Sequence, residues 1–164
     1  MPDVSQIVDA KSIRVRAAAI FVNRNRLLVH VVENQDDGKI WHIPPGGGIQ
    51  YGESSVDALK KEIKEELDWS ISGEQLIGSF ESYHSINGMK EHEISFVYLA
   101  KLLNSSDLSY ASREVIEDNG KKKTFQWMDL ETLKHPRSLL YPEGLLEKIE
   151  ANQSLQATRT SPAA

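Results

Sequence analysis

Three consecutive glycines, Gly46 to Gly48, follow two prolines and lead into a segment crowded with glutamates. Glycine permits backbone conformations and close approaches that other residues do not, whereas prolines favour extended geometry and block a helix. Apolar residues then recur at helical spacing and predict one buried stripe; they are Val56, Leu59, Ile63 and Leu67. The stretch from Pro44 to Trp69 is therefore predicted to be a glycine loop followed by an amphipathic helix, with Glu53, Ser54 or Ser55 as its N-cap.

The glutamates of this helix lie on one face. At about 100° of rotation per residue, Glu62, Glu65 and Glu66 share an arc of about 100° directly beside the apolar stripe. Ala58 lies one turn before Glu62 and leaves room for a ligand to approach. Such carboxylates repel one another, by a few tenths of a kcal/mol per helical pair. This pattern indicates a divalent-cation site, and the alternative is a solvated acidic face balanced by Lys60, Lys61 and Lys64.

The whole chain has the length of one domain, with 164 residues and a net charge of −5. The negative charge disfavours a nucleic-acid partner. The absence of cysteine excludes disulfides and thiolate chemistry. No apolar run is long enough to span a membrane, and the N-terminus lacks a signal-peptide pattern, so we predict a cytoplasmic protein. Residues 1–11 are predicted to be a lead-in, 12–150 the domain and 151–164 a disordered tail; a homodimer is compatible with the sequence.

Alternating and apolar runs predict a sheet around this helix. The expected strands are Ile13 to Val22 and Leu27 to Val32 as a hairpin, Ile40 to Ile43, Gln75 to Tyr83, Glu93 to Leu103, and Lys121 to Met128. The polar stretch from Asn104 to Asn119 is expected to be a loop. Asp129 is expected to cap a short helix, and a last helix is expected from Tyr141 to about Ile149. Strands with few helices predict an α+β fold.

The segment from Gly47 to Trp69 resembles the Nudix box. Gly47 and Glu53 fill its first two positions, Lys61 to Glu66 follow in register, and Asp68-Trp69 closes it. Trp41 to Pro44 and Phe125 to Leu130 also resemble family features, so the resemblance covers about Ser12 to Glu150. It implies an α/β/α sandwich with a mixed sheet, and an enzyme that hydrolyses a diphosphate linkage.

The resemblance also implies roles for single residues. Glu62, Glu65 and Glu66, with the Gly46 carbonyl, would hold Mg²⁺ or Mn²⁺, which prefer oxygen ligands. Glu53 and Lys61 would complete the catalytic set. Lysine at position 61 replaces the family's arginine and lacks its planar fork, and Asp68 replaces the closing glycine. These departures leave open a weak or inactive Nudix-like domain that binds nucleotides or contacts a protein without turnover. If the acidic helix is only a solvated face, the remaining alternative is a plain α+β interaction module.

Substrate contacts are predicted outside the glutamates. N–H groups at Gly47 and Gly48 could hold a phosphate oxygen, and Arg14 and Arg16 point to one face of their strand, where they meet substrate phosphate or are exposed strand charges. A glutamate of the helix or of a later loop would accept the proton from the attacking water; the loop candidates are Glu114 and Glu117. The histidines show no zinc-like spacing. The predicted substrate is a nucleotide or another small nucleoside diphosphate conjugate, whose identity stays open.

Overall fold

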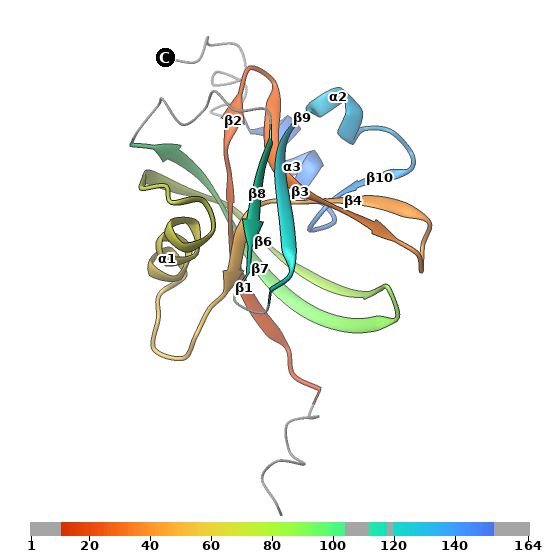
Figure 1. The fold of residues 1–164 in the computed structure, drawn as a ribbon, viewed down its shortest axis with the longest axis horizontal. Coiled ribbons are helices and arrows are strands. Elements are labelled where there is room, and N and C mark those ends of the chain that lie inside the picture. The colour runs from red at the N-terminus through yellow and green to blue at the C-terminus, as the bar shows by residue number, and fades with distance from the viewer. Residues whose placement is uncertain (1–10, 104–111, 118–119, 153–164) are drawn as a thin grey trace, which may run out of the picture.

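The computed structural model describes residues 11–103, 112–117 and 120–152. Within these residues the strands form two sheets (Figure 1). The first has the order β5 (Gly46–Gly48), β1 (Arg14–Ile20), β7 (Met89–Leu102) and β6 (Ile71–Ile86). The second has the order β10 (Ser138–Leu140), β4 (Lys39–Ile43), β3 (Arg26–Asn34), β9 (Lys122–Asp129) and β8 (Ser112–Ile116), and β2 (Val22–Asn23) pairs with β3. The β1–β7 and β10–β4 pairs are parallel while their neighbours are antiparallel, so both sheets are mixed.

Three helices within the described residues cover two sides of the strands: α1 (Ser55–Leu67) on one side, and α2 (Leu130–Leu133) and α3 (Leu145–Ala151) on the other (Figure 1). The alternating side chains of β1 separate two cores. Ala17 and Ala19 pack in the cluster that contains the α1 leucines, whereas Ala18 and Ile20 pack with α2 and α3. This arrangement is the sandwich that the α+β prediction anticipated.

Helix α1 follows the sequence prediction closely. Ser54 is the N-cap, and its hydroxyl accepts a hydrogen bond from the Asp57 backbone N–H at 3.1 Å. Leu59, Ile63 and Leu67 are completely buried. Asp68 ends the helix in the left-handed region at φ 56°, the conformation that the family's closing glycine would adopt more easily.

The predicted β1–β3 hairpin is wrong. The turn exists, with positive φ at Arg24 and Asn25, but only the short β2 pairs with β3, while β1 lies in the other sheet beside β7. The reason is that β1 is apolar on both faces. A strand buried from both sides lies in the interior of a sheet, and β1 pairs with β5 and β7 on its two edges.

Several boundaries also differ from the predictions. The glycine segment is a strand rather than a loop, the predicted polar loop contains β8, and the last helix begins later, at Leu145. Strand β10 was not predicted, because three residues carry too little periodicity to be recognised. Asp129 is the N-cap of α2 but makes no side-chain capping hydrogen bond. Most of the predicted lead-in and tail, and residues 104–111 and 118–119, lie outside the described residues. No helix in the described part of the chain is long and apolar enough to cross a membrane.

Candidate active site

The backbone of the glycine strand β5 lies in close contact with β1 on one side and with α1 on the other. Gly46 pairs with Ala18, and a Cβ at Gly46 would overlap the backbone of Ala17 and Ala18. A Cβ at Gly47 would overlap the carboxyl group of Glu62. Close packing therefore requires glycine at both positions, and at Gly46 the backbone angle φ of 157° also favours glycine. At Gly48 a Cβ would have only ordinary contacts, the nearest being Arg14 Nε at 3.7 Å.

Glu62 and Glu66 lie one turn apart on α1, and both are partly buried. Burial raises the pKa of Glu62, and the charge of Glu65 raises it further. Burial raises the pKa of Glu66 to about 7, although the charges of Lys123 and Arg16 oppose this shift. The Oε2 atom of Glu66 is buried and has no hydrogen-bond partner among the described residues. The two side chains therefore form an acidic face that is only partly neutralised.

The other two predicted glutamates lie differently. Glu65 is exposed on the flank of α1. Glu53 belongs to the loop before the helix, where its carboxylate accepts hydrogen bonds from the Gln50 N–H at 2.9 Å and from Lys61 Nζ at 2.7 Å. These bonds lower the pKa of Glu53, and the bond to Glu53 raises the pKa of Lys61. Lys61 thus ties the helix to the preceding loop instead of pairing with a glutamate of the acidic face.

Lys123, on β9, supplies a positive charge to the acidic face, which the sequence prediction missed. Its Nζ lies 3.7 Å from Glu66 Oε1 and 3.0 Å from Glu117 Oε1. Glu117, one of the two predicted loop glutamates, is therefore close to α1. Glu114 is not, because it pairs with Lys122 at 3.3 Å on an exposed part of the β8–β9 hairpin. The sequence did contain a signal for this lysine. Lys123 alternates with Phe125 and Trp127 along one strand, which places all three side chains on the same face.

Arg14 and Arg16 line one cavity of about 240 Å³, together with Gly46 and Lys123. The cavity lies between the two sheets, since residues of β1, β6 and β7 face residues of β3, β4 and β9 across it. Arg16 is 6% exposed, and its Nη2 donates to the Pro44 carbonyl at 2.5 Å while Nη1 has no partner among the described residues. Both arginines therefore direct positive charge to this cavity.

Glu93, which also lines this cavity, is bound by three neighbouring side chains. Its carboxylate is 3% exposed and accepts hydrogen bonds from Tyr141 Oη at 2.6 Å and Ser95 Oγ at 3.1 Å. Arg14 Nη1 lies 3.6 Å from its other oxygen. Burial and the bond to Glu93 raise the pKa of the Tyr141 hydroxyl far above the usual range. Sequence reasoning missed this network because it depends on the β1–β7 register, in which Arg14 lies opposite Glu93.

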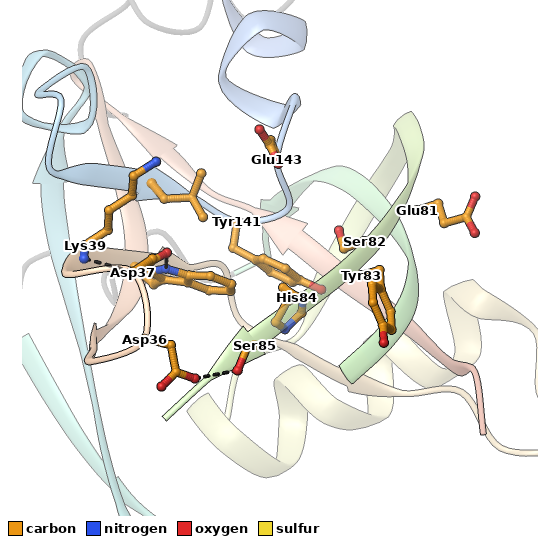
Figure 2. Close-up of a pocket in the computed structure, with 12 residues that line it drawn as sticks. Asp36, Asp37, Lys39, Glu81, Ser82, Tyr83, His84, Ser85, Tyr141 and Glu143 are labelled. Atoms are coloured by element: carbon orange, nitrogen blue, oxygen red, sulfur yellow. Dashed lines mark hydrogen bonds between the residues drawn. The ribbon is translucent and has the colours of Figure 1, made fainter. Parts of the chain in front are cut away.

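Figure 2 shows a second cavity, of about 330 Å³. Trp41, His84 and Tyr141 line both this cavity and the first one. The rings of Trp41 and Tyr141 are stacked 5.4 Å apart, and His84 meets both at their edges. Four residues with carboxylates are among those that line this cavity: Asp36, Asp37, Glu81 and Glu143. An aromatic wall with acidic acceptors suits a flat organic group that carries N–H donors.

The β3–β4 loop closes over one end of the second cavity by binding the tip of the β6–β7 hairpin. Asp36 accepts hydrogen bonds from Ser85 Oγ and from the Gly88 N–H, the first of which is visible in Figure 2. These bonds lower the pKa of Asp36. At the same junction Asn34 Oδ1 accepts a hydrogen bond from the Asn87 N–H, Asn34 Nδ2 donates to the Ser85 carbonyl, and Asn87 Oδ1 accepts from the Gln35 N–H. These hydrogen bonds join the two sheets, because β3 belongs to one sheet and the β6–β7 hairpin to the other.

The oxygen chemistry of the acidic face fits a hard divalent cation. Glu66 Oε2 is buried and unpartnered, and Gly47 lets the Glu62 carboxylate lie directly against β5. Across residues 11–103, 112–117 and 120–152, however, no three histidine, aspartate or glutamate side chains are gathered closely enough to hold a metal ion. The carboxylates that could bind a cation are thus adjacent but not assembled around one point.

Comparison with known proteins identifies the class of protein that this fold and site belong to. The profile of the NUDIX domain matches residues 13–147, so the chain belongs to the NUDIX family. The predicted MutT-like Nudix resemblance and sandwich fold are confirmed. No curated protein sequence was found to be significantly similar to the chain.

Solved structures share the fold at low sequence identity. A MutT NUDIX hydrolase from Burkholderia pseudomallei has 22% identity and a TM-score of 0.53, over 91% of this chain and 97% of that one. A NUDIX hydrolase from Nitrosomonas europaea has 19% identity and a TM-score of 0.53, over 92% and 93%. An ADP-ribose pyrophosphatase from Streptococcus suis has 16% identity and a TM-score of 0.52, over 93% and 97%. These similarities concern the fold.

Proposed function

We propose that this protein is a metal-dependent hydrolase that cleaves a diphosphate linkage in a nucleotide or nucleoside diphosphate derivative, by attack of water on phosphorus. The observation that carries the proposal is the meeting of two surfaces. The Glu62 carboxylate lies against the glycine strand, with Glu66 one turn further along the same helix, and Gly46 of that strand lines a cavity together with Arg14 and Arg16. A phosphorylated substrate needs both surfaces: cations for its oxygens, and carboxylates that hold a divalent ion.

Each part of the site has a role in this proposal. Glu62 and Glu66, with Glu65 and the Gly46 carbonyl, hold Mg²⁺ or Mn²⁺, which when bound neutralises phosphate charge and acidifies the attacking water. Arg14 and Arg16 bind phosphate oxygens, and the N–H groups of Gly47 and Gly48 assist them. The aromatic cavity receives the nucleoside or other organic group. Glu53 and Lys61 position the helix relative to the loop.

Glu117 is the group that we assign as general base. It lies in the turn after β8, 3.0 Å from Lys123 and near Glu66, whereas Glu114 is turned toward solvent with Lys122. A base must lie within hydrogen-bond reach of the water whose proton it takes.

Residues 12–150 are proposed to form the whole catalytic domain, which includes the family match. The protein is proposed to act in the cytoplasm.

The test is release of phosphate or pyrophosphate from a panel of nucleoside diphosphates, triphosphates and diphosphate conjugates, with and without Mg²⁺ or Mn²⁺. Glu66→Gln is expected to lower kcat/KM by about 10²- to 10³-fold, as the loss of a group that stabilises transition-state charge does elsewhere. Glu114→Gln, which removes the same charge from the exposed hairpin, is the control. Equal rates in Glu66→Gln and wild type would refute the assignment.

The glycine strand offers a matched pair for the same assay. Gly47→Ala should displace the Glu62 carboxylate and lower the rate by about 10-fold or more, since small misplacements at an active site are costly. Gly48→Ala meets no close contact and should leave the rate nearly unchanged. Equal effects of the two substitutions would show that contact with Glu62 is not what the glycine protects.

A second candidate function is nucleotide binding without turnover. Lys61 and Asp68 depart from the family box, and Lys123 partly neutralises the acidic face. In that case nucleotides would raise the melting temperature while no member of the panel is hydrolysed. Hydrolysis of any panel member in wild type, lost in Glu66→Gln, decides for the enzyme.

A further inference from the structure

The ammonium group of Lys123 lies between two carboxylates that come from different parts of the chain. It is 3.0 Å from Glu117, in the turn after β8, and 3.7 Å from Glu66, on α1. The Lys123 side chain is only 21% exposed, and its Nζ lies 5.8 Å from the centre of the Phe125 ring. The Lys123 side chain is therefore largely shielded from solvent, and its ammonium group belongs to the acidic face.

Lys123 provides a positive charge close to the largely buried carboxylate of Glu66. The Glu66 side chain is 13% exposed, and a buried carboxylate is costly unless a cation pairs with it. Lys123 lies beside Oε1 of Glu66, while the buried Oε2 has no hydrogen-bond partner in the described part of the chain. Lysine also suits a replaceable partner, since its ammonium is a point charge on a flexible stem without a fixed fork geometry.

The same carboxylates are those that a divalent cation needs. Glu66 is a proposed metal ligand and Glu117 the proposed base, yet no three acidic or histidine side chains are assembled around one point within the described residues. The Lys123 ammonium group already lies within 4 Å of both of these carboxylates, at 3.7 Å from Glu66 and 3.0 Å from Glu117. A divalent ion that approaches Glu66 meets the Lys123 ammonium at close range, where like charges repel.

We propose that Lys123 is the resident counter-ion of the acidic face: it neutralises Glu66 and Glu117 in the metal-free protein, and a divalent cation binds only by displacing its ammonium group. Lys123 also lines the cavity that contains Arg14 and Arg16. The displaced ammonium therefore stays within the cavity where substrate phosphate binds, and metal binding frees a third cation for the substrate. This inference rests on the proposed function, because it takes the acidic face to be a metal site.

The experiment measures the Mg²⁺ affinity of the full chain by calorimetry, and independently by the rise of the melting temperature with Mg²⁺ concentration. Lys123→Gln is expected to bind Mg²⁺ about tenfold more tightly than wild type, because the competing charge is gone. Lys122→Gln is the matched control, because it removes the same charge from the adjacent lysine. Lys122 pairs with Glu114 on the exposed hairpin. It should stay within about twofold of wild type. Lys123→Arg keeps the charge and should retain weak binding.

Other results overturn the inference. Unchanged or weaker Mg²⁺ binding in Lys123→Gln would show that Lys123 does not compete with the metal. Equal tightening in Lys123→Gln and Lys122→Gln would show a general effect of net charge instead. Lys123→Met, which keeps the apolar stem that packs near Phe125, replaces Lys123→Gln if that variant is misfolded. Hydrolysis by wild type with Mg²⁺ tests the proposed function separately, so turnover with unchanged affinity in Lys123→Gln defeats this inference alone.

Discussion

Glu93 and Glu66 both carry carboxylates that are largely removed from solvent, but the protein surrounds them with very different sets of partners. Glu93, on β7, accepts hydrogen bonds from Tyr141 and Ser95 and faces Arg14 at 3.6 Å. Glu66, on α1, has one cation at 3.7 Å and one oxygen without a hydrogen-bond partner among the described residues. The first carboxylate is satisfied by the protein itself, and the second is not.

The number of hydrogen-bonding and charged partners distinguishes a buried carboxylate that stabilises the fold from one that is available to a ligand. Taking an ion out of water costs several kcal/mol unless partners replace the water, so a satisfied carboxylate holds its neighbours in place. A poorly satisfied carboxylate persists only because the rest of the structure forces it there. In this protein the forcing element is α1, whose leucines are fully buried and fix the helix that carries Glu66. A cation that binds from solution can supply the partner that the Oε2 atom of Glu66 lacks among the described residues.

The largest expected effect concerns the satisfied member of the pair. Glu93→Ala removes the carboxylate that interacts most strongly with the buried Arg16 and leaves the Tyr141 hydroxyl without its acceptor, so it should lower the free energy of unfolding by about 3 kcal/mol. Burial lowers the pKa of Arg16, and Glu93 is the main charge that opposes this shift. Urea denaturation measures the loss. Glu81→Ala, at an exposed carboxylate paired with His92, is the control; a similar small loss in both variants would break the comparison.

The next effect is a pH dependence caused by Glu66. Its pKa is raised to about 7 in the folded protein, above an ordinary value near 4.3 in the unfolded chain. The stabilising effect of the protonated form is complete below pH 4 and is lost as pH rises to about 7. Glu66→Gln should remove this loss and be more stable than wild type at pH 8, by about 2 kcal/mol, when divalent ions are chelated.

Denaturation of both proteins at pH 5 and pH 8 in EDTA measures this difference. Glu114→Gln should keep the wild-type pH profile, because Glu114 is on the exposed hairpin. The same stability difference at both pH values would mean that Glu66 does not titrate in this range, and the contrast with Glu93 would then lose its electrostatic basis.

The smallest expected effect is at Lys61, outside the buried region. Its ion pair with Glu53 is partly exposed, the Lys61 side chain being 41% exposed. Lys61→Arg restores the planar group of the family box and should raise turnover by about two- to threefold, since exposed pairs contribute little. Lys60→Arg, whose lysine pairs with Glu74, is the control for charge and length. An unchanged rate would show that the exposed pair does not limit the positioning of the acidic face.

Local features of the fold were predictable because neighbouring residues specify them. The spacing of Leu59, Ile63 and Leu67 predicted α1 and its buried face, and the serine cap and the left-handed Asp68 agree with capping preferences. The register of the box also placed Glu62 and Glu66 on one side of the helix. Long-range pairing was less predictable, as the wrong β1–β3 hairpin and the missed β8 and β10 show. Alternation identifies a strand without naming its partner.

The sequence by itself determined the family, the helix and the glutamates that lie along its face, because periodicity and a spaced motif are local properties. Only the tertiary structure decided which carboxylates are buried and what stands beside them. Lys123 comes to Glu66 from another strand, and Arg14 meets Glu93 through the parallel β1–β7 register. The charge state of a carboxylate depends on its solvation and its neighbours within a few ångströms, and folding alone sets both.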